Sequence, residues 1–193
     1  MTPVEHRPWV GERFRAQPAG KRLLIAGFSH HGYGYGVDGR DDPEFTKRTV
    51  ADLGVNGTHP FFNGIAGYFA NDPADFWSRV AFFNTLPSTV GDDRYAYGTP
   101  AQVEAVKPRV LRIIDETRPD RIFVFTRKGW RMWPDYTGRL KDGTLRMAGL
   151  DEVDCGTYAH PNGEAIAFGL RHPQFARAAD IKAIVAAALT FTP

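Results

Sequence analysis

Three polar side chains in this sequence are of types that could do chemistry together: Ser29, Asn84 and His172. A serine hydroxyl can act as a nucleophile or hold a water molecule. A carboxamide offers both a hydrogen-bond donor and an acceptor, and an imidazole can stabilise a developing anion. Each residue alone is equally compatible with a turn or a strand end. The chemistry therefore depends on whether the fold brings the three side chains together.

Four apolar runs predict strands that are buried on both faces of a parallel sheet. These runs are residues 23–26, 80–84, 122–125 and 165–168. The last run follows Pro161-Asn162-Gly163, which predicts a hairpin turn. Ligands of parallel sheets bind at the carboxyl ends of the strands. Ser29, Asn84 and His172 are therefore expected to open on one edge of the sheet.

Helix signals lie between these strands. Helices are expected from Asp42 to about Leu53, from Asp72 into the second strand, from Thr99 with a kink near Pro108, and from about Ala176 to Leu189. Alternating strands and helices predict an α/β fold, a three-layer α/β/α sandwich with a central, mostly parallel four-stranded sheet. Residues 1–20 are expected to form an arm that is flexible or lies on a surface, and residues 21–193 a single domain.

The composition excludes several classes of protein. The chain has 193 residues, a net charge of +2 and one cysteine, Cys155. One cysteine cannot build a disulfide framework, a cysteine zinc site or a four-thiolate iron–sulfur cluster. The longest apolar run, near 181–189, is shorter than the roughly 20 residues of a membrane span, and the N-terminus does not resemble a signal peptide. We expect a cytoplasmic monomer without a metal or cofactor.

Four short motifs follow one another along the chain. They are Gly27-Phe28-Ser29-His30, the strand end Val80 to Leu86 with Asn84, Pro119-Asp120 before the third strand, and Arg171-His172-Pro173-Gln174. In this order, over about residues 21 to 190, they resemble the motifs of the uracil-DNA glycosylase superfamily. The first motif is most similar to a bacterial branch that reads Gly-x-Ser-His.

The resemblance implies a DNA glycosylase, an enzyme that flips a base out of DNA and hydrolyses its N-glycosidic bond to leave an abasic site. His172 would then stabilise the departing base as an anion. Asn84 would read the Watson–Crick edge of the flipped pyrimidine. Phe45 would stack on the base, with Tyr33 or Tyr35 as alternates.

One position departs from the strongest members of that superfamily, whose first motif carries an aspartate that activates water. Ser29 stands there, and a serine cannot act as a carboxylate base. Ser29 and His30 are expected to position the water without deprotonating it. Alternatively, Asp42 or Asp38 supplies the carboxylate.

The loop of the first motif also bears on the substrate. Its glycines leave room beside the base, namely Gly32, Gly34, Gly36 and Gly39. The excised base is therefore expected to be either uracil or a bulkier modified cytosine of the kind found in phage DNA. The second substrate would give the enzyme a role in anti-phage defence, and the first a role in DNA repair.

The resemblance places DNA along the edge that carries His172. Arg171 and Arg177 would contact phosphates, and Gln174 or Phe175 would enter the minor groove as a wedge. Binding of this kind weakens with added salt. The alternative for Phe175 is a place in the core.

Two other functions remain open. A serine, an asparagine and a C-terminal histidine also outline an SGNH-type esterase with Ser29 as nucleophile. That family's Gly-Asp-Ser block is absent, and no aspartate precedes His160 or His172 by three residues. The chain could also be a DNA-binding module that has lost catalysis. Turnover of a modified-base duplex or of a simple ester distinguishes these possibilities.

Overall fold

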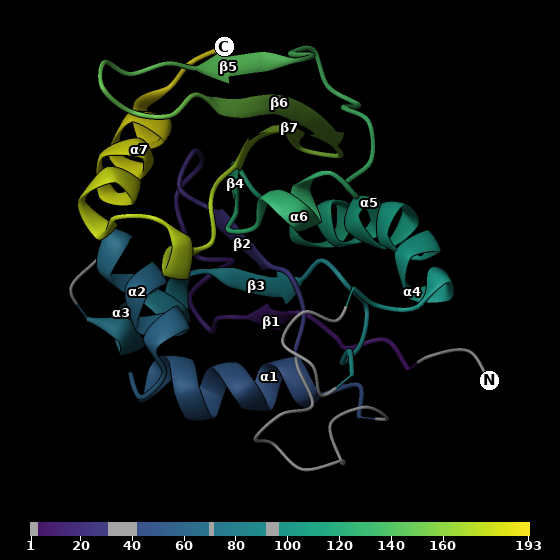
Figure 1. Ribbon diagram of the computed structural model, residues 1–193. Coiled ribbons are helices and arrows are strands. Elements are labelled where there is room, and N and C mark those ends of the chain that lie inside the picture. The colour runs from purple at the N-terminus through teal and green to yellow at the C-terminus, as the bar shows by residue number, and fades with distance from the viewer. Residues whose placement is uncertain (1–3, 31–41, 70–71, 92–96) are drawn as a thin grey trace.

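The computed structural model describes residues 4–30, 42–69, 72–91 and 97–193 (Figure 1). Within them, seven strands form one mixed sheet in the order β1-β3-β2-β4-β7-β6-β5. The strands are β1 Trp9–Val10, β2 Leu23–Gly27, β3 Ala81–Asn84, β4 Arg121–Val124, β5 Gly143–Leu145, β6 Val153–His160 and β7 Gly163–Gly169.

The four predicted strands are confirmed as the parallel centre of this sheet, β3-β2-β4-β7. The prediction of a mostly parallel, four-stranded sheet is wrong, because β1, β6 and β5 extend it by three antiparallel pairings. β1 and β5 have only two and three residues, too few to show an alternating pattern. The predicted hairpin turn at 161–163 joins β6 to β7.

Seven helices, a π-helical segment and a 3₁₀ turn accompany the sheet in the described residues. They are α1 Phe45–Thr49, η2 Val50–Val55, α2 Pro60–Phe69, α3 Pro73–Arg79, α4 Pro100–Glu104, α5 Val106–Thr117, α6 Arg127–Trp130, η3 Pro173–Phe175 and α7 Ala178–Thr190. The sequence did not predict α2 and α6.

Two helix predictions need correction. The helix expected from Asp42 begins at Phe45, and the Asp42 carboxylate accepts the N–H of Glu44 (2.9 Å) before it. The helix that starts at Thr99 has the predicted capping box but breaks at Ala105. Pro108 explains the break, because it has no N–H for the carbonyl four residues earlier.

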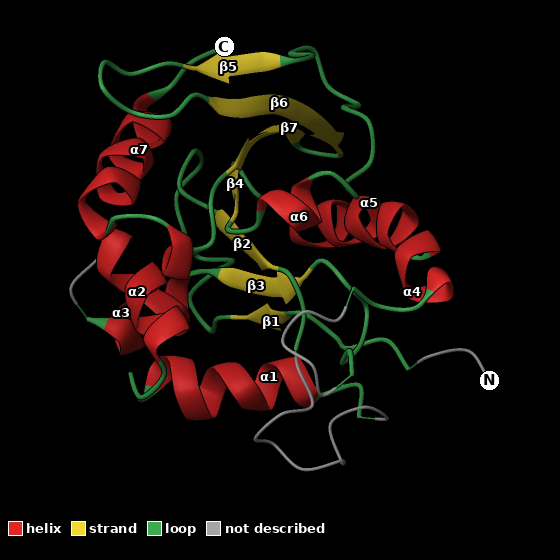
Figure 2. Cartoon of the chain, viewed as in Figure 1, coloured by secondary structure: helices red, strands yellow, loops and turns green. Residues whose placement is uncertain are grey.

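Helices lie on either side of the central strands (Figure 2), and alternate residues of these strands belong to two different apolar clusters. Ile25, Phe82 and Phe123 pack in one apolar cluster with side chains of α2, α3 and α7. Leu24 and Phe83 belong to a second cluster with α5. Both faces of the sheet are therefore covered, which explains why its strands are continuously apolar in sequence.

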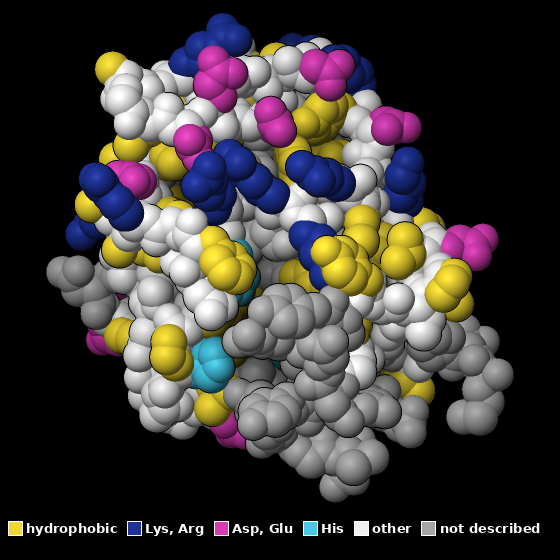
Figure 3. All heavy atoms as spheres, in the orientation of Figure 1, with side chains coloured by type: hydrophobic (Ala, Val, Ile, Leu, Met, Phe, Trp, Pro, Cys, Tyr) yellow, Lys and Arg dark blue, Asp and Glu magenta, His cyan; other side chains and the backbone are white. Residues whose placement is uncertain are grey.

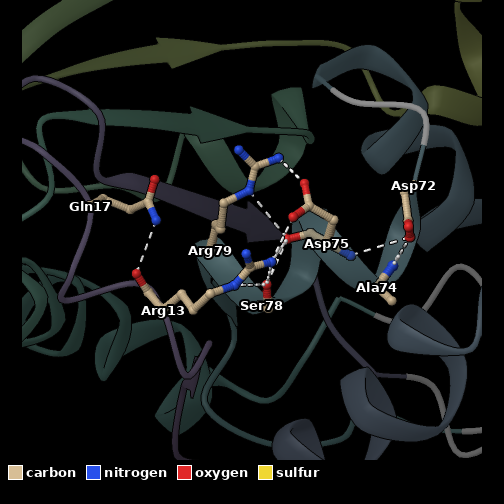
Figure 4. Close-up of polar contacts among 7 residues, drawn as sticks. All are labelled: Arg13, Gln17, Asp72, Ala74, Asp75, Ser78 and Arg79. Atoms are coloured by element: carbon tan, nitrogen blue, oxygen red, sulfur yellow. Dashed lines mark hydrogen bonds and ion pairs between the residues drawn. The ribbon is translucent and has the colours of Figure 1, made fainter.

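The N-terminal residues lie along the outer edge of β3. Trp9 pairs with Phe82, and the nearby Phe14 is only 2% exposed. Figure 4 shows how Arg13 holds this segment to α3, donating to Asp75 Oδ1 (2.6 Å) and to Ser78 Oγ (2.9 Å from Nε). The hydrogen bond from Arg13 lowers the pKa of Asp75. In the described parts of the chain, none of the helices has the length and apolar character needed to span a membrane.

Candidate active site at the carboxyl edge of the sheet

The ends of β2 and β3 meet at Gly27 and Asn84, which are register partners. A methyl group on the Gly27 Cα would lie 2.3 Å from Asn84 Oδ1. The Asn84 carboxamide therefore lies directly over the Gly27 backbone, in space that any other residue at position 27 would fill. This close approach explains why the first motif needs glycine at the end of its strand.

Phe61 links this carboxamide to His172. The Phe61 and His172 rings are stacked, with centroids 5.2 Å apart and planes 25° apart. The same methyl group on Gly27 would lie 3.4 Å from Phe61 Cζ. Asn84 and Phe61 thus border the same space above Gly27, and His172 lies against Phe61. The sequence missed this role of Phe61 because it did not predict α2.

The backbone that follows β7 orients the His172 ring. His172 precedes the 3₁₀ turn η3, and its Nδ1 accepts the N–H of Gln174 at 3.1 Å. With Nδ1 as acceptor, the neutral imidazole carries its hydrogen on Nε2. His172 therefore has the tautomer that can donate to an oxygen that gains negative charge.

Arg109, on α5, holds the backbone at the end of β3. Its guanidinium is 2% exposed and donates to Asn84 O (2.5 Å), His6 O (2.8 Å) and Glu5 Oε1 (3.0 Å). Burial lowers the pKa of Arg109 to about 10, which still leaves it charged at neutral pH. Arg109 thus holds the backbone of Asn84 and ties the N-terminal segment to it.

Ser29 lies two residues beyond the end of β2. Its Oγ is buried and has no hydrogen-bond partner among the described residues. The neighbouring His30 is engaged, since its Nε2 lies 2.9 Å from Thr46 Oγ1. Of the two residues predicted to position water, Ser29 is therefore the one whose side chain keeps hydrogen-bonding capacity.

Phe45, the residue predicted to stack on the base, is 7% exposed. Its ring packs against His30 (centroids 4.9 Å apart) and His6 (5.3 Å). Phe61 is half-buried and more accessible. The stacking role of Phe45 stays a prediction. Tyr33 lies outside the described residues, as do Tyr35 and Asp38.

Asp42 has structural partners in this fold. One carboxylate oxygen accepts the N–H of Glu44, and the other pairs with Arg48. These contacts hold the chain at the start of α1. Its predicted role as a base for water stays a prediction.

The residues predicted to contact DNA lie together after β7. Phe175 is 71% exposed, so the alternative of a core position is wrong, and its ring lies 5.8 Å from that of His172. Gln174 is exposed beside it. Arg177 pairs with Asp180 (3.1 Å), and Arg171 is exposed on the same loop. Lys and Arg side chains form a band across this face between α7 and α6 (Figure 3).

Lys128 is a second residue that the sequence did not single out. It follows β4 on α6, and its Nζ lies 4.3 Å from the centroid of the Phe28 ring and 2.9 Å from that of Tyr97. Burial lowers the pKa of Lys128. Because Phe28 belongs to the first motif, this cation lies at the same edge of the sheet as Ser29.

Two surface hollows lined by described residues lie away from Asn84 and His172. One, of about 420 Å³, lies among aromatic residues that include Trp130, Tyr136 and Tyr158. The other, of about 660 Å³, lies between the N-terminal segment and α5. Neither contributes to the candidate site.

The chain matches no family model, and no curated protein is significantly similar to it.

The start of α2 predicts a pH effect on this site. His59 Nδ1 accepts the N–H of Phe61 (3.2 Å), and burial lowers the pKa of His59 below its usual 6.5. The folded state thus favours the neutral ring, so this contribution to stability is complete above the unfolded pKa and is lost as the pH falls through the folded value. We therefore expect the protection factor of the Phe61 amide, which is its exchange rate compared with the intrinsic rate at the same pH, to decrease between about pH 7 and pH 5.

His59→Asn is the control for this prediction. Asparagine can accept the same N–H in a local turn but does not titrate in this range. Its Phe61 amide should keep its protection from about pH 7 to pH 5. An equal loss of protection in both proteins would show that another group is responsible.

Proposed function

We propose that this protein is a DNA glycosylase that hydrolyses the N-glycosidic bond of a flipped uracil or modified pyrimidine. The observation that carries the proposal is the arrangement of Asn84 and His172 about Phe61 and the bare backbone of Gly27. A carboxamide that can read a base and an imidazole that can stabilise it as an anion meet at one sheet edge. We also propose that the protein is a cytoplasmic monomer and that its helices and sheet form a three-layer α/β/α sandwich.

The reaction makes two electrostatic demands. As the bond between C1′ and the base nitrogen breaks, the base takes the electron pair and the sugar becomes cationic. His172 Nε2–H would donate to a base carbonyl oxygen, whose negative charge grows in the transition state. Water then adds its oxygen to C1′, and the proton that it loses neutralises the departed base anion. The Phe61 ring holds the imidazole in place, so Phe61 acts as a positioning residue.

Asn84 would supply selection for the base. Its carboxamide can donate to one position and accept from another on the Watson–Crick edge of a pyrimidine. Arg109 holds the Asn84 carbonyl, and Gly27 leaves room for the side chain. The amide is thereby preorganised, which makes its hydrogen bonds more effective in recognition.

Ser29 is the group that best fits the task of holding water. Its buried hydroxyl can accept from and donate to a water molecule without removing its proton. We expect Ser29→Ala to lower the single-turnover excision rate by about tenfold or more, because a misplaced nucleophile loses much of its effective concentration. Asp42→Asn should retain most of the rate and lose thermal stability through the contacts at the start of α1. The opposite pattern would assign water activation to Asp42.

The test of the proposed function is a panel of single- and double-stranded oligonucleotides that each carry one uracil or one modified pyrimidine, including glycosylated cytosines. After incubation, alkali cleaves the strand wherever a base has been removed. Release of uracil alone favours repair, and release of the bulky cytosines favours anti-phage defence. Duplex binding without release of any base would instead support a non-catalytic module, and hydrolysis of a simple ester would support the esterase.

A further inference from the structure

Two arginines from neighbouring strand ends bind the same carboxylate oxygen. Asp151 Oδ2 lies 2.6 Å from a terminal nitrogen of Arg171 and 3.5 Å from one of Arg127. Val124 at the end of β4 is the register partner of Gly169 at the end of β7. Arg127 follows the first strand by three residues and Arg171 follows the second by two, so the sheet itself brings the two guanidinium groups together.

The carboxylate belongs to a different part of the fold. Asp151 lies on the segment that connects the antiparallel strands β5 and β6. All three side chains are about half exposed, at 48% for Arg127, 46% for Arg171 and 50% for Asp151. A solvent-exposed ion pair of this kind is weak. Another anion can therefore replace the Asp151 carboxylate at low cost.

The site has the chemistry of phosphate recognition. Guanidinium groups bind phosphate oxygens as they bind carboxylate oxygens, through directed N–H donors. Arg171 immediately precedes His172, and the band of Lys and Arg side chains in Figure 3 crosses the same face. A phosphate held here would thus lie beside the nucleotide whose base reaches His172.

We propose that Arg127 and Arg171 form a phosphate-binding site and that Asp151 occupies it until a phosphate of the DNA backbone displaces the carboxylate. The DNA as source of the phosphate rests on the proposed function. Asp151 is then a built-in competitor that weakens binding to DNA. Removing its charge should tighten binding, whereas removing either arginine should weaken it.

The test compares Asp151→Asn with Glu152→Gln. Glu152 is the next residue, pairs with Arg146 at 2.7 Å and loses the same single charge in its variant. Binding to an unmodified duplex should be about threefold tighter in Asp151→Asn than in Glu152→Gln, in keeping with a weak exposed pair. Arg127→Ala and Arg171→Ala should each weaken binding and reduce the salt slope by about 1. In the double arginine variant, the gain from Asp151→Asn should disappear.

Inorganic phosphate provides the second probe. In Asp151→Asn, the Nε–H resonances of Arg127 and Arg171 should shift when phosphate is added, and at lower phosphate concentration than in the parent protein. Equal duplex affinities of Asp151→Asn and Glu152→Gln would overturn the role of Asp151 as a competitor. If the Nε–H resonances of Arg127 and Arg171 do not shift when phosphate is added, the phosphate-binding site itself is overturned. If no base is excised while these effects persist, the phosphate site stands and the proposed glycosylase activity falls.

Discussion

Replacing His172 with alanine should lower the single-turnover rate of base excision by about 10²- to 10³-fold while the protein stays folded. Loss of one preorganised donor to a developing oxyanion typically raises the barrier by about 2.7 to 4 kcal/mol. The ring is half-buried and stacks on Phe61, and we expect its removal to leave the two apolar clusters intact. Chemical quench on a duplex with the excised base measures the rate, and a thermal melt checks the fold.

The chain provides a matched control in His160. Like His172, it precedes a proline and accepts the N–H two residues later, that of Asn162, at its Nδ1 (3.2 Å). His160 is the last residue of β6, at the turn before β7, and its Nε2 lies 2.9 Å from Pro119 O. His160→Ala should reduce stability and leave the excision rate unchanged. An equal loss of rate in both variants would show that His172 acts through the fold and has no role with the leaving group.

These two histidines also show how far the sequence could lead. Three His-Pro pairs occur, at 59, 160 and 172, and all three have the same local hydrogen bond. Only the order of motifs along the chain favoured His172. The four central strands were predictable because burial on both faces makes their residues continuously apolar. Of the extra strands, β6 was implied by the hairpin turn, but β1 and β5 were not predictable, since they have only two and three residues and pair with other segments of the chain.

The aromatic part of the site was the least predictable. Phe45 and Phe61 both follow the first motif, and nothing in their local sequence distinguishes a packed ring from an accessible one. Their difference comes from tertiary contacts: the histidines at positions 6 and 30 cover Phe45, and α2 presents Phe61 to His172. The first turn of α2 is shaped by His59, whereas sequence reasoning looks for Ser, Thr, Asp or Asn there.

Arg109, in contrast, left a signal. It lies at helical spacing from Val106 and Ile113, on the apolar side of α5, where a charge is costly unless it has partners. Such a residue predicts buried acceptors nearby. The structure supplies them as the carbonyl oxygens of Asn84 and His6 and the carboxylate of Glu5. What the sequence could not show is that one of these acceptors belongs to the candidate site.

The close approach of Gly27 and Asn84 leads to the second large prediction. Gly27→Ala should lower the excision rate on the order of 100-fold, because a displacement of about 1 Å in a positioned group can have that effect. The new methyl group would lie 2.3 Å from Asn84 Oδ1, the end of a side chain that can rotate away. The strand should therefore persist while the carboxamide leaves its place above position 27. Gly67→Ala is the control, since a methyl group there meets nothing within 4 Å.

The double variant separates this explanation from a general disturbance of β2. If Gly27→Ala acts only by displacing the Asn84 carboxamide, then Gly27→Ala with Asn84→Ala should excise no more slowly than Asn84→Ala alone. The double variant should also melt at a higher temperature than Gly27→Ala, because a shorter side chain at position 84 removes the clash. Additive losses of rate would mean that the methyl group perturbs Ser29 or Phe61 as well. In that case, the space above Gly27 would be shared by the whole site and would not belong to Asn84 alone.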